Sequence, residues 1–183
     1  MKVLDKYKKY FSEEDIEKYG ECFEYKNELG EHIANKYRFT SKNAKPKMLF
    51  EADTNINTLF NMDKVNPGEP LLITEGEFDC LSAIESGFKN AVSIPSGVNS
   101  TNEWLTTNWT FLEQFEEIIL WFDNDDPGRK GAREVYNRLS NDSVKIVNYT
   151  KHNDINEVLY KEGKEEILEA IEKAQSPAVE GIY

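Results

Sequence analysis

Cysteine is scarce in this chain, with only Cys22 and Cys80, which lie far apart in the sequence. Two isolated cysteines provide neither the paired spacing of a zinc site nor a disulfide framework, so both are expected to be reduced thiols. No apolar run is long enough to span a bilayer, and the first residues do not have the pattern of a signal peptide. These absences predict a cytoplasmic protein without a membrane partner.

Basic residues are also few, since 22 Lys and Arg stand against 34 Asp and Glu in 183 residues and the net charge is -12. This balance argues against a protein that holds nucleic acid by bulk attraction. It still permits contact with phosphates through bound metal and a local basic strip. The one locally basic stretch contains Arg38, Lys42, Lys45 and Lys47 and no acid. Taken alone, such a short run favours a solvated loop over a phosphate contact.

Turn residues at 66–70 divide the chain into two parts. The first part, residues 1–69, predicts a small α+β subdomain with helices in 2–19 and a β-hairpin formed by 22–25 and 32–39. The second part, residues 70–174, alternates short apolar strands with helices. Its strands are expected at 71–74, 91–94, 118–122 and 144–147, and its helices at 78–86, 102–115, 126–139, 154–160 and 163–174. Alternation of this kind predicts an α/β fold whose central sheet is mostly parallel and flanked by helices, and 175–183 is expected to be a tail.

Carboxylates follow two of the predicted strands at the point where each strand ends. Glu75 comes directly after 71–74, and Asp123 and Asp125 follow the apolar run that begins at Ile118. Ligands of open parallel sheets bind outside the carboxyl ends of the strands, so these acids are expected on one rim. Clustered carboxylates raise one another's pKa unless a cation neutralises them, and hard oxygen ligands favour Mg²⁺ or Mn²⁺. The sequence therefore predicts a metal site.

Neighbouring acids allow more than one interpretation. Asp79 lies one helical turn after Glu75, where its carboxylate can converge on the same point, but a structural role is equally open. Asp126 precedes Pro127 and is expected to be a helix cap and no ligand, while Glu77 is expected to be solvated. Asp154 has the pattern of a cap for the next helix, although its place after the fourth strand also permits a metal ligand.

Three stretches together resemble the Toprim domain, which bacterial-type primases, topoisomerases, OLD-type nucleases and recombination-mediator proteins share. They are Glu75-Gly76-Glu77-Phe78-Asp79, the run from Phe122 to Ala132 with its Asp-x-Asp and Gly-Arg, and Asp154-Ile155-Asn156-Glu157. The segments between them are most similar to the RNA-polymerase (primase) domain of phage-type helicase-primases. The resemblance covers roughly residues 22 to 174.

This resemblance implies a Toprim fold and a metal-dependent nucleotidyltransferase that makes short RNA primers on a template during DNA replication. It implies catalytic roles for Glu75, Asp123 and Asp125. It also implies that Mg²⁺ (or Mn²⁺) is held by Glu75, Asp79, Asp123, Asp125 and Asp154. The basic strip then becomes a phosphate contact, and the residues implied to bind nucleic acid or nucleotide are Arg38, Lys42, Lys45, Lys47, Arg129 and Lys151. Lys151 stands near Asn153, the position at which the family's lysine is expected.

The implied partners are a single-stranded DNA template and ribonucleoside triphosphates in a bacterial or phage-infected cell. A replicative helicase and a zinc-ribbon module are further candidate partners, because neither zinc-ribbon cysteines nor a helicase P-loop occurs in these residues. Two alternatives stay open. One is a Toprim nuclease that uses the same acids to activate water, and the other is a non-catalytic Toprim module that binds nucleic acid or a protein.

Overall fold

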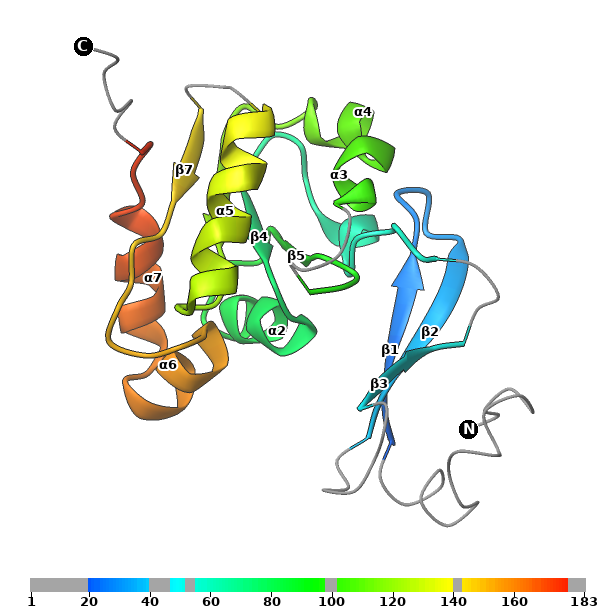
Figure 1. The fold of residues 1–183 in the computed structure, drawn as a ribbon, viewed down its shortest axis with the longest axis horizontal. Coiled ribbons are helices and arrows are strands. Elements are labelled where there is room, and N and C mark those ends of the chain that lie inside the picture. The colour runs from blue at the N-terminus through cyan, green and yellow to red at the C-terminus, as the bar shows by residue number, and fades with distance from the viewer. Residues whose placement is uncertain (1–19, 40–46, 52–54, 98–101, 140–142, 178–183) are drawn as a thin grey trace.

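The computed structural model describes residues 20–39, 47–51, 55–97, 102–139 and 143–177, which form two sheets and the helices around them (Figure 1). The larger sheet has four parallel strands in the order β5-β4-β6-β7, and the smaller has three antiparallel strands in the order β1-β2-β3. The predicted α/β fold, with a mostly parallel sheet and an N-terminal hairpin, is confirmed. The expected helices in 2–19 lie outside the described residues.

The small sheet is built on a hairpin. Strands β1 (Gly20–Lys26) and β2 (His32–Phe39) pair antiparallel, and β3 (Met48–Phe50) adds to the free side of β2. The turn between β1 and β2 is closed by the Asn27 side chain, whose Oδ1 accepts the backbone N–H groups of Leu29 and Glu31. Aromatic side chains from this sheet face the larger one.

The parallel strands are short, apolar and almost entirely buried. They are β4 (Leu71–Thr74), β5 (Ala91–Ser93), β6 (Ile118–Trp121) and β7 (Val144–Ile146). Continuous apolar runs of this kind are typical of parallel strands that are covered on both faces. Residues 175–177 then lie along β7, because Gln175 pairs with Ile146 and the Ser176 hydroxyl donates to the Val144 carbonyl.

Helices cover both faces of the parallel sheet. One face carries α2 (Glu77–Glu85), α6 (Ile155–Lys161) and α7 (Lys164–Glu172). The other carries α3 (Glu103–Thr107), α4 (Trp109–Leu112) and α5 (Asp126–Leu139), and the 3-10 helix η2 spans Met62–Lys64. The predicted single helix over 102–115 is in fact two, because the Asn108 side chain donates to the Trp104 carbonyl and to that of Asn57 at the break.

Alternate residues of each strand enter two separate cores. Leu71 and Ile73 of β4 pack with residues from α3, α4 and α5, whereas Leu72 packs with α2, α6 and α7. The second core also contains Phe23 and Tyr25 of the small sheet, so the two sheets share one apolar interior. Within the described ranges, no helix is long and apolar enough to cross a membrane.

Candidate active site

The carboxyl ends of β4 and β6 bring the predicted acids to one rim. Thr74 and Trp121 are paired neighbours in these strands, so Glu75 and Asp123 follow at the same edge. The backbone N–H of Asp123 donates to Glu75 Oε2 at 3.3 Å. Asp79, in the first turn of α2, accepts the backbone N–H of Asn156 in α6 at 3.0 Å. Packing between α2 and α6 thus places Asp79 beside the N-terminus of the helix that follows Asp154.

The electrostatics of this rim are those of crowded carboxylates. Burial, followed by the charges of Glu75, Asp79, Asp154 and Asp125, raises the pKa of the Asp123 carboxyl to about 8. Burial also raises the pKa of Asp79 to about 7; the Asn156 N–H opposes this shift, and the charges of Asp154 and Glu75 add to it. The other four predicted metal ligands therefore all act on Asp123.

Two of these acids also begin helices. Asp125 Oδ1 accepts the Gly128 N–H at 2.7 Å, and the Asp125 carbonyl accepts the first helical N–H, from Arg129. Asp125 is therefore the cap of α5, and the prediction that Asp126 is the cap was wrong by one residue. Asp126 is instead exposed and pairs with Arg129. Asp154 caps α6 by accepting the Glu157 N–H at 2.7 Å, as its sequence pattern predicted.

Gly128 allows α5 to begin directly against the rim. A Cβ atom at this position would lie 2.1 Å from the Asp123 carbonyl oxygen, and real Cβ atoms do not approach backbone so closely. Gly128 belongs to the Toprim-like run from Phe122 to Ala132, but the sequence alone did not indicate its role. Its position three residues after Asp125, at the first turn of a helix, is the signal that could have identified it.

The predicted basic residues have different surroundings. Arg129 donates to the Asn124 carbonyl and Oδ1 as well as to Asp126, Lys151 pairs with Glu162 at 2.6 Å, and the Arg38 guanidinium lies 4.7 Å from the centre of the Phe78 ring. Lys47 is exposed, and Lys42 and Lys45 lie outside the described residues.

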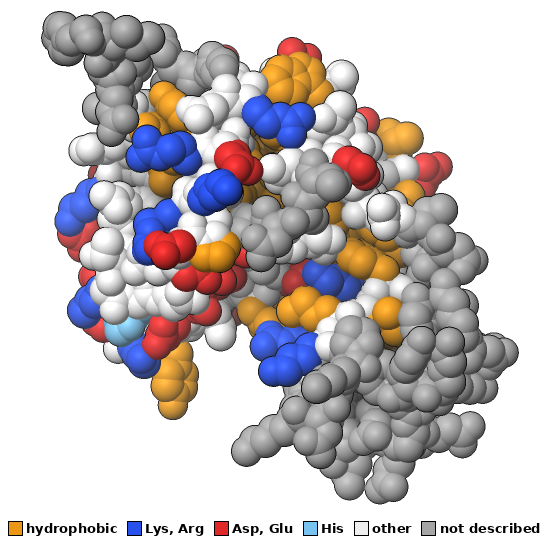
Figure 2. All heavy atoms as spheres, viewed as in Figure 1, with side chains coloured by type: hydrophobic (Ala, Val, Ile, Leu, Met, Phe, Trp, Pro, Cys, Tyr) orange, Lys and Arg blue, Asp and Glu red, His pale blue; other side chains and the backbone are white. Residues whose placement is uncertain are grey.

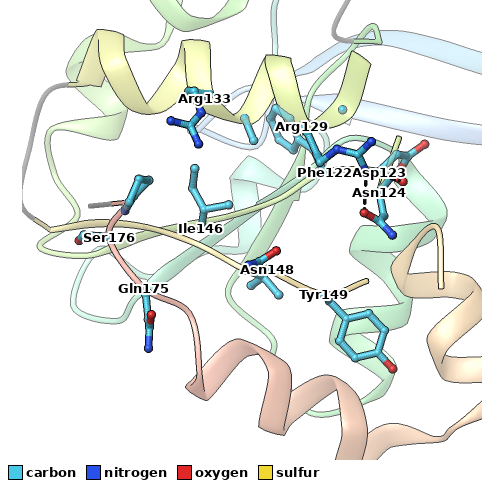
Figure 3. A pocket seen from close by; sticks show the side chains of 14 residues that line it. Phe122, Asp123, Asn124, Arg129, Arg133, Ile146, Asn148, Tyr149, Gln175 and Ser176 are labelled. Atoms are coloured by element: carbon cyan, nitrogen blue, oxygen red, sulfur yellow. Dashed lines mark hydrogen bonds between the residues drawn. The ribbon is translucent and has the colours of Figure 1, made fainter. Parts of the chain in front are cut away.

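A cavity of about 360 Å³ opens beside Asp123, between α5, the end of β7 and residues 175–177. Figure 3 shows Arg129 and Arg133, one helical turn apart on α5, above Ile146, Asn148 and Tyr149. Among the described residues that line it, Asp123 is the one acid. Figure 2 shows basic side chains gathered over α5 with acidic ones just below them. Sequence reasoning missed Arg133, although its spacing of four residues from Arg129 could have indicated it.

The donor set fits Mg²⁺ or Mn²⁺. In the described part of the chain, no three His, Cys, Asp or Glu side chains lie close enough together to hold one ion as they stand. However, Mg²⁺ is commonly bound through one or two carboxylates, substrate phosphates and several waters rather than by a complete protein cage. The rim supplies hard oxygen donors, and a cation would relieve the repulsion that raises the pKa of Asp123. The residues therefore fit an ion that is held by one or two of these carboxylates and completed by ligands from outside the protein.

Glu77 overturns one expectation at this site. It was expected to be solvated, but only 3% of it is exposed. The Tyr25 hydroxyl and the Lys36 ammonium both donate to its Oε1 at 2.5 Å. These partners come from the hairpin, more than forty residues earlier in the chain, so the local sequence around Glu77 gave no sign of them.

The sequence of this chain is similar to those of several known proteins. Residues 72–159 match a family described as Toprim-like. The chain is 30% identical over 125 residues to the DNA helicase/primase of Enterobacteria phage T3, covering 67% of this chain and 21% of that protein. It is 30% identical over 166 residues to a primase homolog protein of Arabidopsis thaliana, covering 80% of this chain and 48% of that protein.

A solved structure extends this likeness to three dimensions. The primase domains of bacteriophage T7, in a complex with the lagging-strand DNA polymerase, an RNA/DNA hybrid and dTTP, match with a TM-score of 0.76 and 27% identity. The match covers 85% of this chain and 78% of that one. The chain spans only part of its curated relatives: 21% of the length of the phage T3 helicase/primase and 48% of that of the Arabidopsis primase homolog.

Proposed function

Because the chain is a primase-like Toprim domain, we propose that it catalyses template-directed synthesis of short RNA primers by nucleotidyl transfer. The observation that carries the proposal is the position of Asp123. This residue lies at a rim where four other carboxylates raise its pKa, and it also lines the cavity that holds Arg129 and Arg133. A centre that handles phosphates needs both features side by side, acids to hold cations and guanidinium groups to hold phosphates.

The chain's own carboxylates would position the reaction. Glu75, Asp79, Asp123, Asp125 and Asp154 would supply the oxygen donors, with one or two carboxylates to each Mg²⁺ or Mn²⁺. When bound, the metal would lower the pKa of the attacking 3′-hydroxyl and stabilise the leaving pyrophosphate. Backbone N–H groups fix these carboxylates at the rim: one donates to Asp125, one to Asp154, and those of Asn156 and Ile155 to Asp79. Glu75 is our candidate to accept the proton or to share the ion at the attacking side.

The basic residues would hold substrates around that centre. Arg129 and Arg133 would contact the triphosphate in the cavity, whose volume is in the range of nucleotide pockets. On the hairpin side, Arg38 and Lys47, together with Lys42 and Lys45 from the same strip, would contact the template backbone, and Lys151 the nucleotide. The T7 primase domains with an RNA/DNA hybrid and dTTP support these two ligand classes. A helicase or zinc-ribbon module would be the partner that selects the template site.

Primer synthesis can be tested directly with single-stranded DNA, ribonucleoside triphosphates and Mg²⁺ or Mn²⁺. We expect short RNA products from the wild type, and a loss of at least about 100-fold in the Asp123→Asn and Asp125→Asn variants, since electrostatic positioning supplies most of the acceleration in such reactions. Asp63→Asn, which changes an Asp of η2 that belongs neither to the rim nor to the cavity lining, is the matched control and should keep full activity.

Two results would contradict the proposal. Full activity of the Asp123→Asn variant would show that the carboxylates of the rim are not needed for the reaction. Cleavage of labelled DNA with metal alone, in the absence of primers when nucleotides are added, would instead identify a nuclease.

A further inference from the structure

A buried charge outside the rim joins three segments of the chain. The Lys36 side chain leaves β2 and is only 7% exposed. Its ammonium donates to Glu77 Oε1 at 2.5 Å and to the carbonyl oxygen of Pro95 at 2.9 Å, and lies 5.2 Å from the centre of the Phe50 ring. Lys36 therefore connects the small sheet to the first residue of α2 and to the loop after β5.

Glu77 and Pro95, the two hydrogen-bond partners of Lys36, both belong to segments that come close to Glu75. Glu77 is two residues after it, and the intervening Gly76 is the N-cap of α2. Pro95 opens the loop that contains Gly97, and a Cβ atom at Gly97 would be 3.7 Å from Glu75 Oε1. One ammonium group thus contacts the Glu77 side chain, two residues after Glu75, and the backbone of the loop that approaches the Glu75 carboxylate at Gly97.

Tyr25 is a second hydrogen-bond donor to Glu77 and strengthens this arrangement. Tyr25 is fully buried, and its hydroxyl donates to the same Glu77 oxygen at 2.5 Å. Burial and then the charge of Glu77 raise the pKa of Tyr25 well above its ordinary value, so this hydroxyl stays protonated and remains a donor. Two side chains of one sheet therefore fix a single carboxylate oxygen.

Stability alone gives a poor account of such an ion pair. Removing two charges from water costs about as much as their attraction returns, and well-packed apolar residues often replace buried pairs without loss. A buried pair does fix geometry, because each partner has one low-energy position. We propose that Lys36, acting through Glu77 and Pro95, is a positioning residue that holds Glu75 in its working place at the rim. This inference rests on the proposed function, in which Glu75 acts on metal or proton.

Direct contact between Lys36 and a nucleotide is a different reading and predicts a different outcome. The ammonium is buried and donates hydrogen bonds to Glu77 and to the Pro95 carbonyl, so it has little access to a phosphate. A positioning role changes kcat and metal affinity and leaves the KM for nucleotide nearly constant, whereas a nucleotide contact changes KM.

The test uses a double variant, Lys36→Met/Glu77→Gln, which removes both charges and leaves no unpaired one. The matched control is Lys145→Met/Glu117→Gln, because that ion pair of 2.6 Å joins β7 to the residue before β6, at the opposite end of the parallel sheet. We expect the Lys36 double variant to fold, to lose about tenfold in kcat and in Mn²⁺ affinity measured by calorimetry, and to keep its nucleotide KM within about twofold. The control should match the wild type in all three.

Mn²⁺ affinity separates this inference from the proposed function. If the wild type makes no primers, the proposed function fails, but a tenfold loss of Mn²⁺ affinity in the Lys36 variant alone still supports positioning. Wild-type kcat and Mn²⁺ affinity in a folded double variant would overturn the inference, as would a raised nucleotide KM with unchanged kcat. If the double variant does not fold, Tyr25→Phe decides, since it removes one hydroxyl from the same oxygen. A lowered kcat and Mn²⁺ affinity supports positioning, and unchanged values overturn it.

Discussion

Asp123 is surrounded by the other carboxylates of the rim, and its protonation should determine how the stability of the protein depends on pH. The pKa of this carboxyl is about 8 in the folded protein, against about 3.9 in an unfolded chain. Between these values the folded state binds more protons than the unfolded state, so the free energy of unfolding falls as pH rises from about 4 to 8. In EDTA we expect the wild type to melt at a lower temperature at pH 8 than at pH 5.5.

Asp123→Asn should weaken this dependence, because it removes one member of the repelling group. At pH 8 in EDTA we expect its melting temperature to rise by about 2–4 °C, the shift that about 1 kcal/mol produces in a chain of this size. Added Mg²⁺ should stabilise the wild type at pH 8 more than the variant. Asp126→Asn, exposed and outside the rim, is the control; an equal gain there would attribute the effect to net charge and not to the rim.

Helix α5 shows how one glycine determines where a whole element can begin. Gly128→Ala would place a methyl group 2.1 Å from the Asp123 carbonyl oxygen, which is backbone and cannot rotate away. The start of α5 must then shift, together with Asp125, whose Oδ1 accepts the Gly128 N–H. We expect a loss of about 1–3 kcal/mol in urea unfolding and a loss of primer synthesis.

Gly68→Ala provides the comparison for this change. A Cβ atom there has only ordinary contact, 3.5 Å from Asn66 Oδ1, and the site lies in a surface turn. The Gly68→Ala variant should have the same midpoint of urea unfolding as the wild type. If Gly128→Ala did the same and stayed active, the close approach of α5 to Asp123 would not be a feature of the protein in solution.

The elements were predictable from sequence to the extent that local pattern decides them. Apolar runs and turn residues identified all four parallel strands and the hairpin, because burial on both faces leaves a strong signal. The cap of α5 was misplaced by one residue, since Asp125 and Asp126 have the same side chain and only backbone geometry distinguishes them. Glu77 was misjudged for another reason. Its partners, Tyr25 and Lys36, reach it only after the two sheets pack together.

At the scale of the whole molecule, the two sheets are joined by an aromatic cluster as well as by the Lys36 pair. Phe60, in the connection between them, packs against Phe23 and Tyr25, with its ring centroid 5.7 and 5.5 Å from theirs, and its backbone pairs with Ser93 of β5. These rings belong to the same buried core as Leu72 and Ile119. A shared core couples the unfolding of the two sheets, because neither can leave without exposing the other's apolar face.

Phe60→Ala should therefore destabilise both sheets together. We expect a loss of about 3–5 kcal/mol, typical of a buried Phe, with one transition in urea. Hydrogen exchange measures the two sheets separately: the amides of β1 and β2 and those of β4 and β6 should lose protection by the same free energy. A β1–β2 hairpin that opens at much lower free energy than β4 and β6 would show that the small sheet unfolds on its own. The position of Lys36 against Glu77 could not then hold the rim rigidly, since the residue that supplies the ammonium would leave with the hairpin.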